Sequence, residues 1–145
     1  GILCRVDAKG GPITRLLEFC RPGSVVNMCP MGGLRLKFQQ DKIFYKGEQC
    51  RRIGLLAGGT GIAPMIQIIR AYGQHIRTYP DCPTTELNLI YAAEEVGDLA
   101  YMKILEDVRC QIPDHFRYYV ILNRPPLGWT GGVGFVERHD IVKHM

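Results

Sequence analysis

The segment that most constrains the fold is a glycine-rich turn, Gly58-Gly59-Thr60-Gly61, set between an apolar run and a helical pattern. The run before it, residues 53–57, is short and apolar, which is typical of a buried strand in a parallel sheet. The segment after it has apolar side chains at helical spacing: Ile62, Met65, Ile66, Ile69 and Tyr72. Strand, glycine turn and helix in this order predict the entry to a nucleotide-binding α/β domain.

The residues of this turn suit a phosphate or a planar ring. Glycines at 58, 59 and 61 permit positive φ and leave no Cβ to hold a ligand away from the backbone. The following helix presents free N–H groups and its positive dipole end, and Pro64 falls in its first turn, where a missing N–H costs little. The alternative is a tight turn in an unrelated α/β protein, with Thr60 as the N-cap of the helix. P-loop and nucleophile-elbow motifs are absent from the sequence.

The rest of the chain after residue 51 continues the α/β pattern. Residues 87–92 and 116–122 are predicted strands, and 98–110 and 135–145 are predicted helices. Alternating strands and helices indicate right-handed crossovers, so we expect a parallel Rossmann-like sheet with helices on both faces.

The first fifty residues differ in pattern. Short runs at 2–6 and 25–28 and strict alternation at 34–38 predict strands, and 13–20 predicts a short helix. This resembles the end of a small antiparallel barrel, although a closed barrel needs about six strands or more. We therefore expect residues 1–50 to be the C-terminal part of a barrel domain and 51–145 to be a nucleotide-binding domain that is incomplete at its C-terminus.

Composition excludes several classes of function. A net charge of +4 is too small to indicate a nucleic-acid partner, and no apolar run is long enough to span a membrane. The basic residues between Arg35 and Arg52 are either a solvated surface or a docking face for an acidic redox partner. The six cysteines form no C-x-x-C pair, and the four histidines lack metal-ligand spacing, so we expect no metal site. We also expect the thiols to be reduced, as in an intracellular protein that is cytoplasmic or organelle-associated.

Residues 55–70 closely resemble the NAD-domain entry segment of the NADH–cytochrome b5 reductase family, part of the ferredoxin–NADP reductase-like group. Three more motifs match in order: Gly11-Pro12-Ile13-Thr14, Cys29-Pro30-Met31-Gly32, and 124–129 with 134–136. Pro12 and Cys29 depart from the lysine and glycine that the family has there. The family's R-x-Y-[ST] and C-G-P-P-x-M motifs fall outside the chain, so we expect the fragment alone to be weakly active or inactive.

The resemblance implies two cofactors, FAD and NAD, and assigns residues to them. Gly11, Ile13 and Thr14 would hold the flavin diphosphate, although Thr14 also suits a plain helix cap. Gly58, Gly59, Thr60, Gly61 and Pro64 would line the nicotinamide crevice, with Thr60 as the catalytic residue near the flavin edge.

An acidic residue beyond the second strand accepts the adenosine ribose in dinucleotide folds and repels a 2′-phosphate. Ala92 begins this segment, and alignment to the family gives the role to Asp98, with Glu94 and Glu95 as rivals. The acidic cluster favours NADH over NADPH. The alternative is an ordinary charged helix start.

The function that the resemblance implies is hydride transfer from NADH to FAD, followed by single-electron transfer to cytochrome b5 or a similar acceptor protein. One alternative is the electron-input module of a nitrate- or fumarate-reductase-type fusion enzyme, in which the acceptor is a fused redox domain. Another is a non-catalytic nucleotide-binding module.

Overall fold

The computed structural model describes residues 12–25, 35–39, 42–80 and 85–145. The chain divides into two compact units, residues 1–34 and 35–145. In the first unit, helix α1 (Pro12–Glu18) lies where the sequence predicts a short helix. The predicted strand at 2–6, nearly all of that at 25–28, Gly11 and the motif at 29–32 fall outside the described residues. The other three residues of the Gly11–Thr14 motif begin α1.

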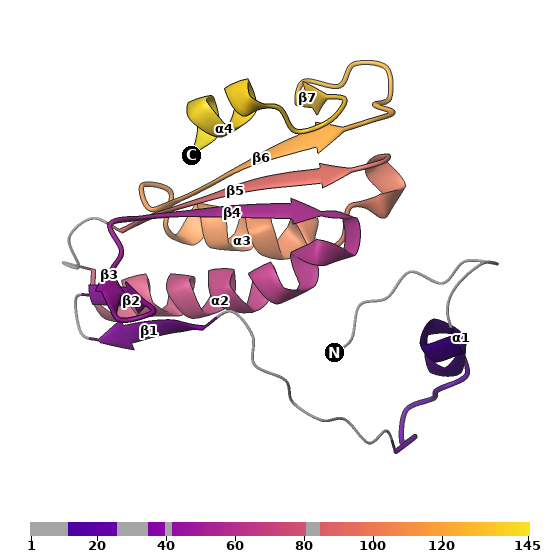
Figure 1. Cartoon of the computed structure of the whole chain (residues 1–145), viewed down its shortest axis with the longest axis horizontal. Helices are drawn as coiled ribbons and strands as arrows, with labels where there is room; N and C mark the ends of the chain where they lie inside the picture. Colours follow the sequence, from indigo (N-terminus) through magenta and orange to yellow (C-terminus); the bar gives the residue numbers. More distant parts are fainter. Residues whose placement is uncertain (1–11, 26–34, 40–41, 81–84) are drawn as a thin grey trace. The chain divides into compact units, whose positions relative to one another are not determined.

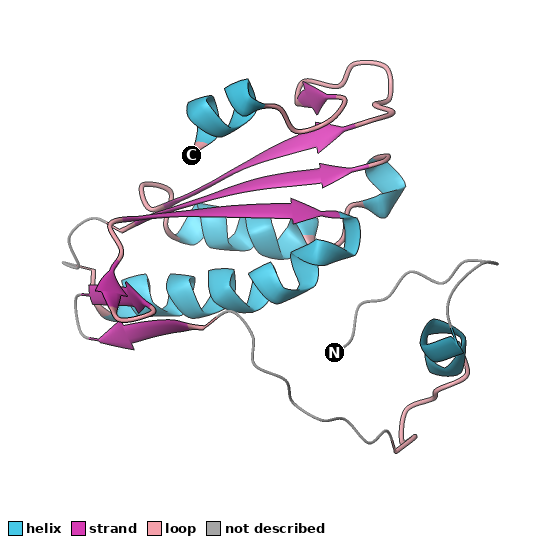
Figure 2. Cartoon of the chain, viewed as in Figure 1, coloured by secondary structure: helices cyan, strands magenta, loops and turns pink. Residues whose placement is uncertain are grey.

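The second unit is built on a four-stranded parallel sheet in the order β4-β5-β6-β7 (Figure 2). Strands β4 (Arg52–Gly58), β5 (Glu86–Ala93) and β6 (Phe116–Leu122) confirm the three predicted strands. Strand β7 (Gly132–Val133) was not predicted, because two residues inside a Pro/Gly-rich loop carry no periodicity.

Helices cover both faces of this sheet, as predicted (Figure 1). Helices α2 (Ile62–Thr78) and α3 (Met102–Gln111) lie on one face, and α4 (Arg138–His144) lies on the other. The α4 helix begins at residue 138 rather than 135. Its start is fixed by a capping box in which Glu137 and Asp140 each accept the other's backbone N–H.

The third predicted helix, 98–110, begins later than the sequence indicates. Residues Val96–Asp98 form a short 3-10 turn, η2, and Tyr101 has a left-handed φ of 63° immediately before α3. The first four residues of the prediction were therefore wrong. The hydroxyl of Tyr91, on the neighbouring strand, hydrogen-bonds to the backbone of this stretch and holds it out of the helix.

The core lies between the sheet and α2 and α3, and every buried apolar side chain among the described residues falls between Ile43 and Leu122. Tyr72 of α2 is fully buried. Its hydroxyl contacts the carbonyl oxygens of Thr85 and His115, at the starts of β5 and β6. This contact fixes the register of the long helix against the sheet and so positions the glycine turn at its other end.

A second, antiparallel sheet of three short strands precedes the parallel one. Strand β1 (Leu36–Gln39) overlaps the alternation predicted at 34–38, whereas β2 (Lys42–Tyr45) and β3 (Glu48–Gln49) were not predicted. Strand β3 is polar, and the four residues of β2 are too few to show a period although Ile43 is buried. The domain boundary between residues 50 and 51 stays a prediction.

Candidate functional site

The candidate site lies where the three long parallel strands end. Strand register places Gly58, Ala92 and Ile121 in one row at the carboxyl ends of β4, β5 and β6. In open α/β sheets, ligands bind outside this edge. The 3-10 turn η1 (Gly59–Gly61) leaves β4 at this point and leads directly into α2.

The glycines of the turn face open space. An added Cβ at Gly58, Gly59 or Gly61 would meet no protein atom within 4 Å. Only Gly59 has a positive φ, of 50°, while Gly58 and Gly61 have φ values of −118° and −60° that any residue adopts. Neither packing nor backbone geometry therefore requires glycine at 58 and 61. The need to leave room for a ligand would explain glycine at both positions. This favours a ligand-binding turn over the alternative of a tight turn without a ligand.

Thr60 does not cap the helix. The N-cap of α2 is Gly61, which makes no side-chain capping bond, so the alternative role for Thr60 was wrong. The Thr60 side chain is exposed and makes no hydrogen bond to any described residue. Its hydroxyl is free to meet a ligand at the strand edge.

The start of α2 presents positive potential without an internal counter-charge. Pro64 is the third residue of the helix and is exposed, and the N–H of Ile62 in the same turn donates to the carbonyl oxygens of Gly59 and Thr60. The first turn contains no acidic residue. The helix dipole is thus left to attract an external anion such as a diphosphate.

The structure distinguishes the three acidic candidates beyond β5. Glu94 lies 3.2 Å from the Arg124 guanidinium and accepts from the Asn123 amide at 3.1 Å, and Glu95 lies 3.7 Å from the same guanidinium. Asp98 makes no side-chain hydrogen bond or ion pair with any described residue. Of the three, Asp98 has the carboxylate that is free to accept a ribose hydroxyl.

Tyr91 holds the backbone that carries Asp98. Its fully buried hydroxyl donates to the Asp98 carbonyl at 3.3 Å and accepts from the Ala100 N–H at 3.0 Å. Burial raises the pKa of the Tyr91 phenol, and the nearby Asp98 carboxylate adds to this rise. The position of Tyr91 in an apolar strand gives no sign of this polar role in the sequence.

The residues predicted to hold flavin belong to the first unit. Ile13 and Thr14 lie in α1 of the first unit, and Gly11 falls outside the described residues. Their assignment stays a prediction. Within the described ranges, no cluster of His, Cys, Asp and Glu could hold a metal ion. No helix in the described part of the chain has the length and apolar character needed to cross a membrane.

Comparison with known proteins agrees with this geometry. A family model described as the oxidoreductase NAD-binding domain matches residues 55–145. Among solved structures, the cytochrome b5 reductase domain of Ulva prolifera nitrate reductase superposes with a TM-score of 0.74 at 25% identity, covering 94% of this chain and 50% of that one. The CS-b5R domains of human Ncb5or share the fold, with a TM-score of 0.66 at 19% identity over 97% of this chain and 36% of that chain.

Curated relatives are similar over much of the chain. An NADH-cytochrome b5 reductase 1 from Neosartorya fischeri is 39% identical over 77% of this chain and 36% of its own length. One from Mortierella alpina is 34% identical over 99% of this chain and 44% of its own length. The chain therefore spans less than half the length of these relatives.

Proposed function

Because this chain belongs to the oxidoreductase NAD-binding domain family, in the branch of the NADH–cytochrome b5 reductases, we propose that it is the NADH-binding part of a flavin-dependent reductase. In the longer protein, hydride would pass from NADH to FAD, and electrons would then pass singly to cytochrome b5 or a similar acceptor. The relatives' printed names and the NAD-binding family model support this proposal.

One structural observation carries the nucleotide part of the proposal. An open glycine turn and a free carboxylate lie at the same edge of the sheet, with open space in front of Gly58, Gly59 and Gly61. The diphosphate of NADH would meet the start of α2, whose dipole is uncompensated. The adenosine ribose would hydrogen-bond to Asp98, whose charge would repel the 2′-phosphate of NADPH.

The remaining assignments concern the redox chemistry. Thr60 is proposed to place its exposed hydroxyl beside the nicotinamide, and Ala92 to leave room for the ring at the end of β5. Gly11, Ile13 and Thr14 are proposed to bind the flavin diphosphate. A bound flavin supplies hydride acceptance and single-electron release, whereas the protein contributes placement and electrostatics.

The alternative of a fused electron-input module is favoured by one observation, the similarity to the reductase domain of a nitrate reductase. The two candidates share the nucleotide site and differ in the acceptor. The reading frame around the chain discriminates them, because a fusion enzyme encodes a further redox domain.

The nucleotide site is tested by titrating NADH and NADPH into the chain and following nicotinamide fluorescence. We expect Asp98→Asn to weaken NADH binding about tenfold, which is the effect of losing one hydrogen bond to a charged group. The same variant should reduce the preference for NADH over NADPH. We expect Gly58→Val to abolish binding at unchanged Tm, because the extended backbone and open space at 58 accept a side chain.

Asp107→Asn is the matched control, because Asp107 is exposed on α3 away from the strand edge. It should bind both nucleotides as the parent chain does. NADH binding by Gly58→Val equal to that of the parent chain would contradict the placement of the nucleotide at the glycine turn. The redox part is tested on the longer protein: a colourless preparation that does not oxidise NADH when FAD is added would leave only a nucleotide-binding module.

A further inference from the structure

The segment between β5 and α3 carries Asp98, the free carboxylate of the proposed nucleotide site. After the short turn η2, Leu99 is extended, with φ and ψ of −76° and 98°, and Tyr101 then has a left-handed φ of 63°. Residues 99–101 belong to no helix or strand. Contacts from other parts of the fold must therefore hold the backbone around Asp98 in place.

The end of β6 holds only the start of this segment. The Asn123 N–H donates to the Ala93 carbonyl at 3.1 Å, and the Arg124 N–H donates to the Glu94 carbonyl at 2.7 Å. The Asn123 amide and the Arg124 guanidinium also contact the Glu94 carboxylate, at 3.1 and 3.2 Å. These contacts fix the chain at Glu94 and leave Asp98 to be held from elsewhere.

The Tyr91 hydroxyl holds the other end of the segment. It donates to the Asp98 carbonyl at 3.3 Å and accepts from the Ala100 N–H at 3.0 Å, so one oxygen bridges the backbone on both sides of Leu99. The Tyr91 ring is fully buried in β5. Close packing leaves a buried ring little freedom to move, and the bridge therefore ties the position of Asp98 to the sheet.

The bridge starts from the edge of the candidate site. Register pairs Tyr91 with Ala57 of β4 and Val120 of β6, one row before the row that contains Gly58 and Ala92. The strand that supplies Ala92 to the predicted nicotinamide site thus also supplies the hydroxyl that holds Asp98. Both halves of the proposed nucleotide site are connected to one rigid element.

The two roles proposed for Asp98 differ in how strongly they depend on its position. A hydrogen bond to the ribose requires a donor–acceptor distance of about 2.7–3.2 Å, whereas repulsion of a 2′-phosphate falls off only inversely with distance. A loosened segment would therefore lose the ribose hydrogen bond first and keep much of the repulsion. Such a change weakens NADH more than NADPH.

We propose that Tyr91 is a positioning residue for cofactor choice. Its hydroxyl holds the Asp98 carboxylate where it can accept the adenosine ribose hydroxyl, and so sets the preference for NADH over NADPH. This role rests on the proposed nucleotide function, because Asp98 acts on the cofactor and Tyr91 acts only through Asp98. Phenylalanine would fill the same space in β5 but has no oxygen for the bridge.

The test is Tyr91→Phe, titrated with NADH and NADPH and followed by nicotinamide fluorescence. We expect NADH to bind about fivefold more weakly than to the parent chain, which is the effect of losing one neutral hydrogen bond. NADPH should weaken less, so the ratio of the two dissociation constants should move toward one. Unchanged NADH affinity, or equal weakening of both nucleotides, would overturn the role of Tyr91.

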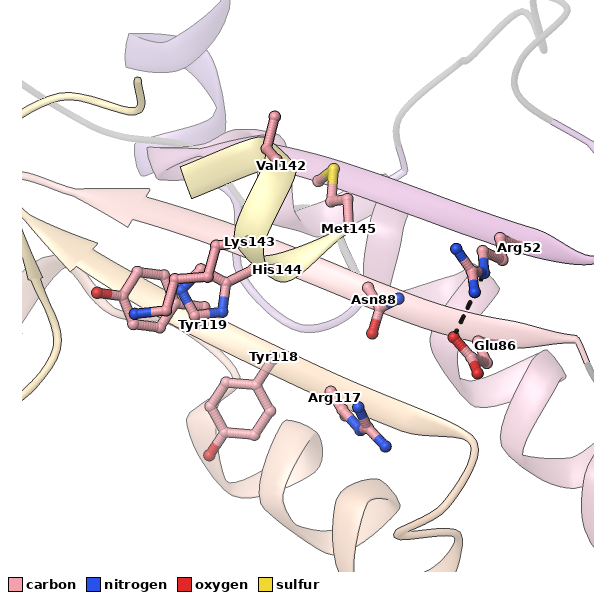
Figure 3. A pocket seen from close by; sticks show the side chains of 10 residues that line it. All are labelled: Arg52, Glu86, Asn88, Arg117, Tyr118, Tyr119, Val142, Lys143, His144 and Met145. Carbon is pink, nitrogen blue, oxygen red and sulfur yellow. Dashed lines mark ion pairs between the residues drawn. The ribbon is translucent and has the colours of Figure 1, made fainter. Parts of the chain in front are cut away.

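Tyr118→Phe is the matched control. Tyr118 lies on the neighbouring strand β6, and its hydroxyl donates to the Glu106 carboxylate of α3 at 2.8 Å. Figure 3 shows the Tyr118 ring directed toward α3. Both variants remove a tyrosine hydroxyl that joins the sheet to another element, and both should lower Tm. Only Tyr91→Phe should change nucleotide affinity, because the Tyr118 hydrogen bond ends on α3 and not on the Asp98 segment.

A double variant separates this role from the proposed function. If Tyr91 acts through Asp98, adding Tyr91→Phe to Asp98→Asn should weaken NADH less than about twofold further. A fivefold further loss would show that Tyr91 acts independently of Asp98 and would overturn the proposal, while Asp98 would keep its role. Unchanged NADH affinity in Asp98→Asn alone would instead contradict the ribose contact of the proposed nucleotide site, and the role of Tyr91 with it.

Discussion

At the scale of single residues, His75 couples folding to pH. It is 8% exposed, its ring centroid lies 5.1 Å from that of Phe38 and 5.2 Å from that of Tyr79, and its Nε2 has no hydrogen-bond partner among the described residues. Burial lowers the pKa of His75 below 6.5. The unfolded chain then binds the proton more readily than the folded chain, so the free energy of unfolding should fall as pH drops below 6.5. The total loss is about 1.4 kcal/mol for each unit by which folding lowers the pKa of His75.

Thermal unfolding between pH 7.5 and 5.5 measures this effect. Tm should fall with pH in the parent chain and fall less in His75→Phe, which keeps an aromatic ring in the same space. An equal fall in both would exclude His75 and point to His144, whose pKa is also lowered by burial and by Lys143. Glu106, with its pKa lowered to about 2 by Arg109, loses its contribution only below about pH 4.5 and lies outside this window.

At the scale of elements, the short strand β7 depends on a glycine that sequence patterns do not reveal. A Cβ at Gly131 would lie 2.5 Å from the Trp129 ring and 2.6 Å from the carbonyl oxygen of Val120. The Trp129 indole N–H also donates to the Gly132 carbonyl at 2.9 Å, so the ring cannot move away without losing this bond. We expect Gly131→Ala to lower the free energy of unfolding by about 1–3 kcal/mol in urea denaturation.

The matched control is Gly97→Ala. The nearest atom to its added methyl group is a Glu95 carboxylate oxygen at 3.8 Å, an ordinary contact. This variant should stay within about 0.5 kcal/mol of the parent. Similar losses in both variants would show that the contact at Trp129 is not the cause.

At the scale of the whole molecule, the compact unit 35–145 contains every buried apolar side chain that the structure describes. We expect a chain of residues 35–145 to fold with far-UV circular dichroism typical of an α/β protein. Its Tm should lie within about 4 °C of the full chain, equivalent to about 1 kcal/mol, and it should bind NADH equally well. A shortened chain that unfolds would show that residues 1–34 contribute to the core.

Local patterns were sufficient for much of the fold. The strands β4, β5 and β6 and the helix α2 follow from apolar periodicity and the glycine turn, which are properties of neighbouring residues. Strands β2, β3 and β7 were missed because they are two to four residues long and owe their existence to pairing. The start of α3 was misplaced because the Tyr91 hydroxyl, on β5, hydrogen-bonds to the backbone of Asp98 and Ala100 and keeps these residues out of the helix.

For the candidate site, the sequence by itself determined the glycine turn, its place between strand and helix, and the acidic segment after the next strand. Only the tertiary structure shows how the acids differ in their partners, because Glu94 and Glu95 meet Arg124 from the end of a different strand, whereas Asp98 does not. Periodicity and turns arise from neighbours in sequence, whereas partners and cavities arise from residues that folding brings together.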